Sequence, residues 1–184
     1  MPRVAALWRH PIKSHGREAL DQVTLVAGQT MPWDRAWAVM HERSKFDAET
    51  PTWVSCRNFM IGVSTPGLAG IWARVDEATG IMHLRHDTLG EISFDPDDSD
   101  DAARFVAWVR PVSPPDKFLQ TGLAKIPDRG MTVSVYPSVA IMTHSSLSAG
   151  MAWQRHPDRR GDLTRRGTHP ALQAHHGQPA HRQA

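Results

Sequence analysis

The chain has 184 residues, of which 40% are hydrophobic and 22% are charged, so it can bury a core as one domain, with or without a tail. No window approaches the roughly 20 apolar residues that cross a bilayer, and Arg9 and Lys13 interrupt the apolar region that a signal peptide requires. The single cysteine excludes an internal disulfide and a cysteine-rich metal site, and we expect a reduced, cytoplasmic protein.

Short runs of apolar residues predict a protein built mostly of strands. In chain order, we expect strands at 3–9, 19–26 and 36–41, and an antiparallel meander at 71–75, 81–86 and 91–94. Residues 57–63 fit a short helix or a strand, and we favour the helix. Pro11 and Gly28 end the first two strands, and turn residues separate the strands of the meander. We expect most of the seven tryptophans to be core residues.

Five aspartates between Asp95 and Asp101 precede apolar residues that repeat at helical spacing as far as Pro111. Acidic side chains favour the start of a helix, and this segment lacks the alternating ligand spacing of a calcium loop. We therefore predict a capped helix here. Further strands are expected at 131–135 and 139–142, followed by a short helix that starts at Leu147.

The positive charge is concentrated in the C-terminal segment. The net charge is +2, and six arginines and two acids from Arg155 onward leave −2 for the preceding 154 residues. Residues 155–184 are rich in histidine, arginine, proline and glutamine, so we expect a basic, low-complexity, disordered tail. Such a tail can attract nucleic acid, but without interleaved aromatic residues we do not expect nucleic acid as a partner.

A candidate phosphate site combines residues at the ends of strands. Lys13 and Ser14 follow one predicted strand and Arg35 precedes another, and their ammonium, hydroxyl and guanidinium groups suit a phosphate-bearing ligand. Thr143, His144, Ser145 and Ser146 lie between a strand and a helix start, where amides and hydroxyls bind anions. An alternative stays open: Lys13 is a solvated cation, Arg35 pairs with Asp34 or Asp21, and Ser145 only caps a helix.

Cys56 and the histidines predict no metal centre. Cys56 lies among apolar residues, Trp53, Val54 and Phe59, so we expect a buried and unreactive thiol. His83 and His86 are three apart on a predicted strand and point to opposite faces. We expect no metal site made of protein side chains alone.

Four segments, in this order and spacing, resemble the N-terminal part of the MOSC family (molybdenum-cofactor sulfurase C-terminal type), which includes iron–sulfur-flavin reductases and the mitochondrial amidoxime-reducing component. They are WRHPIKSHG at 8–16, PWDRAWAVM at 32–40, CRNFM at 56–60 and YPSVAIMTHSSLSA at 136–149. The resemblance implies an α+β, predominantly β fold with a barrel or sheet domain and few short helices. It divides the chain into a MOSC N-terminal-like domain (1–120), the first elements of a MOSC domain (121–154) and the tail (155–184).

The resemblance also implies a function. Members of the family bind a pyranopterin molybdenum cofactor and act as reductases or sulfur-transfer proteins. The resemblance also implies pyridoxal phosphate as a second ligand. Lys13, Ser14 and Arg35 match family cofactor contacts, and Thr143, His144, Ser145 and Ser146 match positions that line the pterin. A functional member would need a small-molecule substrate and an electron-transfer partner.

The chain departs from the family pattern in its last part. The cysteine that ligates molybdenum in the family has no counterpart here, since Cys56 belongs to another motif. We expect a truncated or frameshifted member that is catalytically incomplete and purifies without molybdenum. A non-catalytic module that binds anions or a partner, and a nucleic-acid-associated protein that acts through its tail, remain the alternatives.

Overall fold

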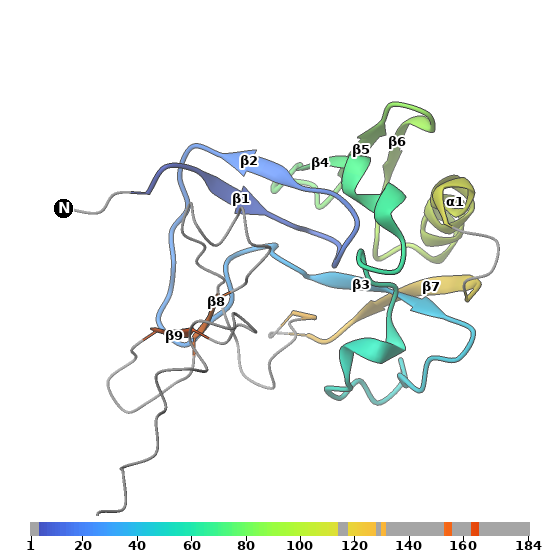
Figure 1. The fold of residues 1–184 in the computed structure, drawn as a ribbon, viewed down its shortest axis with the longest axis horizontal. Coiled ribbons are helices and arrows are strands. Elements are labelled where there is room, and N and C mark those ends of the chain that lie inside the picture. Colours follow the sequence, from blue (N-terminus) through green and yellow to red (C-terminus); the bar gives the residue numbers. More distant parts are fainter. Residues whose placement is uncertain (1–3, 114–117, 128–129, 132–152, 156–162, 166–184) are drawn as a thin grey trace, which may run out of the picture. The chain divides into compact units, whose positions relative to one another are not determined.

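The computed structural model describes residues 4–113, 118–127, 130–131, 153–155 and 163–165 (Figure 1). The chain forms two compact units, Met1–Pro137 and Ser138–Ala184. In the second unit, β8 (Trp153–Arg155) and β9 (Leu163–Arg165) pair antiparallel, a pairing that the sequence analysis did not include. The predicted strand at 139–142 and helix at Leu147 lie outside the described residues, as does nearly all of the strand at 131–135.

The first unit begins with two small antiparallel pairs. β1 (Leu7–Arg9) pairs with β2 (Glu18–Leu20), and β3 (Trp37–His41) pairs with β7 (Gln120–Lys125). The first two strands are shorter than expected from the sequence. Residues 21–26 are largely exposed and pair with no strand in the described part of the chain, so their apolar pattern does not produce a ladder there.

A three-stranded meander follows, as predicted. β4 (Trp72–Val75), β5 (Met82–His86) and β6 (Gly90–Phe94) pair antiparallel in sequence order. The turn between β4 and β5 contains Gly80 at φ 79°, a left-handed conformation that glycine adopts without steric cost. The local turn signals therefore predicted this sheet correctly.

The predicted helix is α1 (Ser99–Val109), which contacts β6 and β7. The Asp98 carboxylate accepts hydrogen bonds from the backbone N–H groups of Asp100 and Asp101, so the aspartates cap the helix as expected. The other helical segments among the described residues are 3-10 turns: η1 (Cys56–Asn58), η2 (Pro66–Gly70) and η3 (Arg110–Val112). The helix predicted at 57–63 is thus wrong, because only one short turn forms there.

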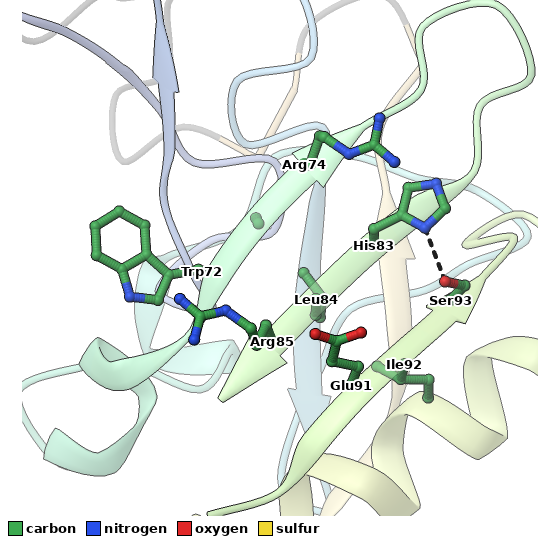
Figure 2. A pocket seen from close by; sticks show the side chains of 9 residues that line it. Trp72, Arg74, His83, Leu84, Arg85, Glu91, Ile92 and Ser93 are labelled. Carbon is green, nitrogen blue, oxygen red and sulfur yellow. Dashed lines mark hydrogen bonds between the residues drawn. The ribbon is translucent and has the colours of Figure 1, made fainter. Parts of the chain in front are cut away.

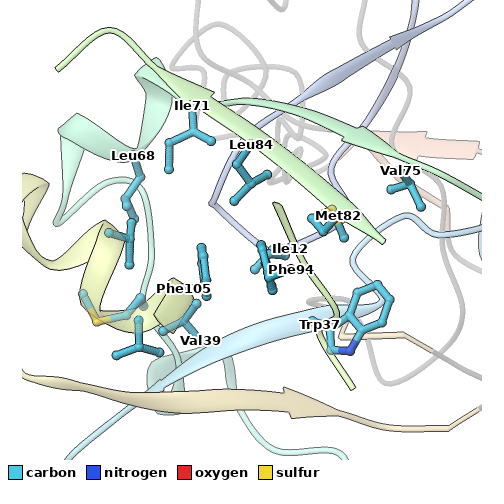
Figure 3. Packing of buried hydrophobic residues seen from close by; sticks show 13 residues of the cluster. Ile12, Trp37, Val39, Leu68, Ile71, Val75, Met82, Leu84, Phe94 and Phe105 are labelled. Carbon is cyan, nitrogen blue, oxygen red and sulfur yellow. The ribbon is translucent and has the colours of Figure 1, made fainter. Parts of the chain in front are cut away.

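Strand β3 separates two hydrophobic clusters. Trp37 and Val39 face the larger cluster, to which the meander, α1 and Ile12 contribute (Figure 3). Within it, the rings of Phe94 and Phe105 stack with centroids 4.8 Å apart. Ala38 faces the smaller cluster, which includes Phe59. The described part of the chain is thus predominantly β with one α-helix, which confirms the predicted fold class.

Candidate anion-binding site

The loop between β1 and β2 lies along the start of β3. The backbone N–H of Lys13 donates to the carbonyl oxygen of Trp37 at 2.8 Å, and the N–H of Trp37 donates to Pro11 at 3.2 Å. The N–H of Arg35 donates to the carbonyl oxygen of His10 at 2.6 Å. These backbone hydrogen bonds bring the Lys13–Ser14 and Arg35 segments, about twenty residues apart in sequence, to one place.

Left-handed backbone conformations concentrate in these two segments. Among the described residues, the non-glycine positions with positive φ are Ser14 (65°), Trp33 (62°) and Arg35 (53°). Such conformations cost of order 1 kcal/mol each for residues with a Cβ, and the surrounding structure must hold them in place. Two of the three predicted site residues that the structure describes, Ser14 and Arg35, therefore carry backbone strain.

Gly16 closes the first of these segments. Its φ is 96°, and a Cβ built on it would lie 2.9 Å from Cγ2 of Ile71. A side chain at this position would be strained and would also collide with the core. The loop that presents Lys13 can therefore return into β2 only with glycine here.

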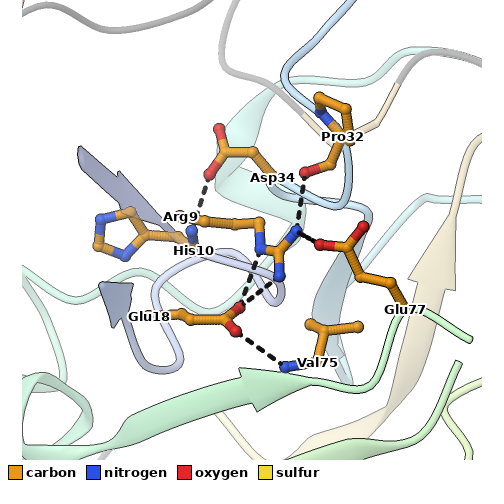
Figure 4. A network of polar contacts seen from close by, with 7 residues as sticks. All are labelled: Arg9, His10, Glu18, Pro32, Asp34, Val75 and Glu77. Carbon is orange, nitrogen blue, oxygen red and sulfur yellow. Dashed lines mark hydrogen bonds and ion pairs between the residues drawn. The ribbon is translucent and has the colours of Figure 1, made fainter. Parts of the chain in front are cut away.

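Asp34 ties the two segments together through its side chain. Asp34 is 4% exposed, and its carboxylate accepts the backbone N–H of His10 at 2.8 Å (Figure 4). The same carboxylate forms an ion pair with the Arg35 guanidinium. The pairing of Arg35 with Asp34, one of the alternatives raised from the sequence, is confirmed. The ion pair does not remove Arg35 from the site, since it fixes the guanidinium beside the loop that carries Lys13.

A buried arginine braces the hairpin behind the site. Arg9 is 2% exposed, and its guanidinium lies 2.8 Å from Glu18 and 2.7 Å from Glu77 (Figure 4). Glu18 also accepts the backbone N–H of Val75 at 3.3 Å. The network links β1, β2 and β4. The sequence analysis missed it because a charge inside a short strand gives no sign of which distant acids surround it.

Lys13 is buried rather than solvated, so that part of the alternative interpretation is wrong. Its side chain is 6% exposed, and its Nζ atom lies 5.5 Å from the centre of the Phe59 ring. Within the described segments, no carboxylate pairs with it. Burial lowers the Lys13 pKa to about 8; the neighbouring Cys56 raises that pKa by a smaller amount, and Arg35 lowers it further.

Cys56 lies near Lys13 and is partly exposed, which corrects the expectation of a buried thiol. Phe59 is buried in the smaller cluster, with Trp53 and Val54 packed against it. Cys56 instead begins the η1 turn, in which no residue is buried. The apolar neighbours of the cysteine enter the core, whereas its own side chain does not.

Ser14 is half-buried in the same loop, and a Cβ built on Gly62 would lie 3.9 Å from its Cβ. The structure therefore brings Lys13 and Arg35 into electrostatic contact and places Ser14 next to Lys13. Thr143, His144, Ser145 and Ser146 lie outside the described residues. Whether these four residues join the site remains a prediction.

His15 is a neighbour of the site that the sequence analysis did not single out. Its ring is fully buried, its Nδ1–H donates to the carbonyl oxygen of Lys13 at 2.8 Å, and Nε2 has no partner among the described residues. Burial lowers its pKa to about 4, so the ring is neutral at neutral pH. It supports the Lys13 backbone from inside the core, next to Phe105.

A separate hollow of about 310 Å³ lies on the outer face of the meander (Figure 2). It is lined by outward side chains that include Trp72, Arg74, His83, Arg85 and Glu91. The sequence analysis expected most tryptophans to lie in the core. Trp72 does not, because it is 38% exposed. The hollow lacks a buried cation of the kind found at Lys13.

The described residues contain neither a candidate metal cluster nor a membrane-spanning helix. No group of three or more histidine, cysteine or acidic side chains could hold a metal ion there. No helix in the same residues is long and apolar enough to span a membrane.

Comparison with known proteins gives one family. The model of the MOSC N-terminal beta barrel domain matches residues 1–109, more than half of the chain. This range contains Lys13, Ser14, Arg35 and Cys56. No curated protein and no solved structure matches the chain.

Proposed function

The chain belongs to the MOSC family, which is linked to molybdenum cofactor binding, and on this premise we propose that Lys13, Ser14 and Arg35 bind the phosphate-bearing end of a pyranopterin cofactor. The observation that carries the proposal is the Lys13 side chain, which belongs to a residue only 6% exposed, has no carboxylate partner among the described residues and lies near a second cation, Arg35. A buried charge without a partner is costly, and a bound oxyanion would offset that cost.

The donors present suit the anionic end of the cofactor. Lys13 supplies a point charge with three N–H donors, and the Arg35 guanidinium supplies planar donors in an orientation that Asp34 holds. The Ser14 hydroxyl can donate to a third oxygen. These residues would bind and orient the ligand, and their partial burial would shield it from water.

The bound cofactor would supply redox chemistry at molybdenum. The residues described here account for the phosphate end only, because the metal requires a ligand that this set does not contain. Thr143, His144, Ser145 and Ser146 are proposed to line the pterin. The proposed activity is therefore cofactor binding in the service of reduction or sulfur transfer, with a small-molecule substrate and an electron-transfer partner.

Calorimetric titration tests the proposal with two probes, a hydroxymethylpterin phosphate and the same pterin without phosphate. We expect the phosphorylated probe to bind more tightly, and Lys13→Met to weaken it by about tenfold or more, the value of one charge-assisted hydrogen bond. Lys45→Met removes an exposed lysine and serves as the matched control. Equal binding of both probes, or no loss in Lys13→Met, would refute the phosphate site.

Pyridoxal phosphate is a second candidate, favoured by the lowered pKa of Lys13. Because that pKa is about 8, part of the side chain is a neutral amine at mildly alkaline pH and can attack an aldehyde. Arg35 would hold the phosphate. Borohydride treatment after incubation with pyridoxal phosphate, followed by peptide mass analysis, should then label Lys13. An unlabelled Lys13 would eliminate this candidate.

Lys13, Ser14 and Arg35 could also serve a non-catalytic module that binds anions without molybdenum. Elemental analysis of the purified full chain distinguishes a molybdenum-cofactor-binding protein from a simple anion-binding module. Molybdenum that persists through gel filtration supports a cofactor-binding protein, whereas phosphate binding without molybdenum supports the anion-binding module.

A further inference from the structure

We propose that Cys56 is a modification site for small anionic disulfides, and that the resulting mixed disulfide blocks the anion site at Lys13. The first part stands on the surroundings of Cys56. The second part rests on the proposed function, because it requires that Lys13 also binds an oxyanion.

Cys56 is placed to react with molecules in solution. It is partly exposed at the start of η1, and its backbone is held there by the N–H of Phe59, which donates to the Cys56 carbonyl oxygen at 3.1 Å. It is also the only cysteine in the chain, so any disulfide that it forms must be with another molecule. A partly exposed thiol near the Lys13 ammonium is open to a charged disulfide from solution.

The second observation is the buried ammonium of Lys13. This side chain is more than nine-tenths buried, and no hydrogen bond or carboxylate pairing holds its Nζ within the part of the chain that the structure describes. Phe59 connects the two groups, because its ring lies 5.5 Å from the Lys13 Nζ and its backbone is bonded to Cys56. Arg35 adds a second positive charge near Lys13. We therefore expect the positive charge of Lys13 to favour an anionic disulfide over a cationic one at Cys56.

The reaction is thiol–disulfide exchange. The Cys56 thiolate attacks one sulfur of the disulfide, a new bond forms to the Cys56 Sγ atom, and the original S–S bond breaks. The departing half leaves as a thiolate and takes up a proton from water. Cys56 is oxidised and the departing half is reduced, so the disulfide itself is the oxidant.

The retained half would carry its carboxylates toward Lys13. A carboxylate paired with the ammonium supplies the charge partner that the described residues do not provide, and it competes with a phosphate for the same donors. Modification would therefore switch off anion binding, and reduction by a thiol would restore it.

Kinetic labelling of the full chain tests the first part, with glutathione disulfide as the anionic probe and cystamine as the cationic one. We expect the anionic probe to react about tenfold faster, and added salt to reduce the difference because it screens the charges. Lys13→Met should reduce the preference, whereas Lys45→Met should retain it. Neutral iodoacetamide reports thiol access in each variant and should react at similar rates.

A preference that survives both salt and Lys13→Met, or the absence of any preference, would overturn the proposal. If Lys13→Met does not fold, the salt dependence of the unmodified chain decides alone. Phosphate titration before and after modification tests the blocking. If labelling is charge-selective but phosphate does not bind, the Cys56 modification site is supported and the proposed function is refuted. If phosphate binds but labelling is not selective, the proposed function is supported and the modification site is refuted.

Discussion

The carboxylate of Asp34 accepts the backbone N–H of His10 at 2.8 Å and pairs at the same time with the guanidinium of its neighbour, Arg35. One buried acid thus holds two chain segments that are far apart in sequence. The arrangement explains how an arginine with a left-handed backbone is kept beside the loop that carries Lys13.

Asp34→Ala should destabilise the fold by about 2–4 kcal/mol, because it removes the acceptor of the His10 N–H and the carboxylate that pairs with the Arg35 guanidinium. Urea denaturation measures the loss. Asp87→Ala removes an acid that is 92% exposed, 3.6 Å from Arg85, and should change stability by less than about 0.5 kcal/mol. Similar losses in the two variants would argue against the role assigned to Asp34.

Lys13→Met should stabilise the protein at pH 7, because it replaces a buried ammonium with an apolar side chain of similar length. The pKa of Lys13 is about 8 in the folded chain and 10.5 in the reference state. Between these values the unfolded chain binds more protons, so the unmodified protein gains stability as pH rises, by at most about 3 kcal/mol. The variant should lack this gain. Denaturation curves at pH 7 and pH 10 provide the comparison, and parallel behaviour of both proteins would contradict it.

His15 should make the fold sensitive to acid. Its pKa is about 4 when folded and 6.5 in the reference state, so the unfolded chain binds the proton first as pH falls. The neutral His15 ring contributes fully to the free energy of unfolding above pH 6.5, and this contribution is lost progressively as the pH falls toward 4.

His15→Asn retains a side-chain N–H donor. Between pH 4 and 6.5 it should reduce the slope of the unfolding free energy against pH by the amount that corresponds to about one bound proton. His83→Asn, which alters an imidazole on the outer face of the meander, should leave the curve unchanged. An unaltered slope in His15→Asn would show that other groups cause the acid sensitivity.

Ser14→Gly and Ser14→Ala both remove the hydroxyl but differ in backbone freedom. Because φ at Ser14 is 65°, glycine relieves the left-handed strain that alanine keeps. We expect the glycine variant to be more stable than the alanine variant by about 1 kcal/mol, measured by thermal unfolding. Phosphate affinity should fall in both to a similar extent, and a loss in only one would indicate that backbone shape, rather than the hydroxyl, governs binding.

Local signals in the sequence determined several elements. The turn residues around Gly80 separated the strands of the meander, and Asp98 marked the start of α1, because turns and helix caps depend on residues only a few positions apart. The donor types at the predicted strand ends indicated Lys13 and Arg35 as site candidates, and the family resemblance strengthened that prediction. The Arg35 partner Asp34 was also among the alternatives, since it is adjacent in the chain.

Only the tertiary structure decided how these residues are exposed. Lys13 is buried and Cys56 is partly exposed, the reverse of what their immediate neighbours suggested. The 21–26 segment has apolar residues but no strand to pair with, and His15 lies under the Lys13 backbone because the whole loop packs on β3. Burial and pairing depend on segments distant in sequence, and no local pattern records which of them will meet.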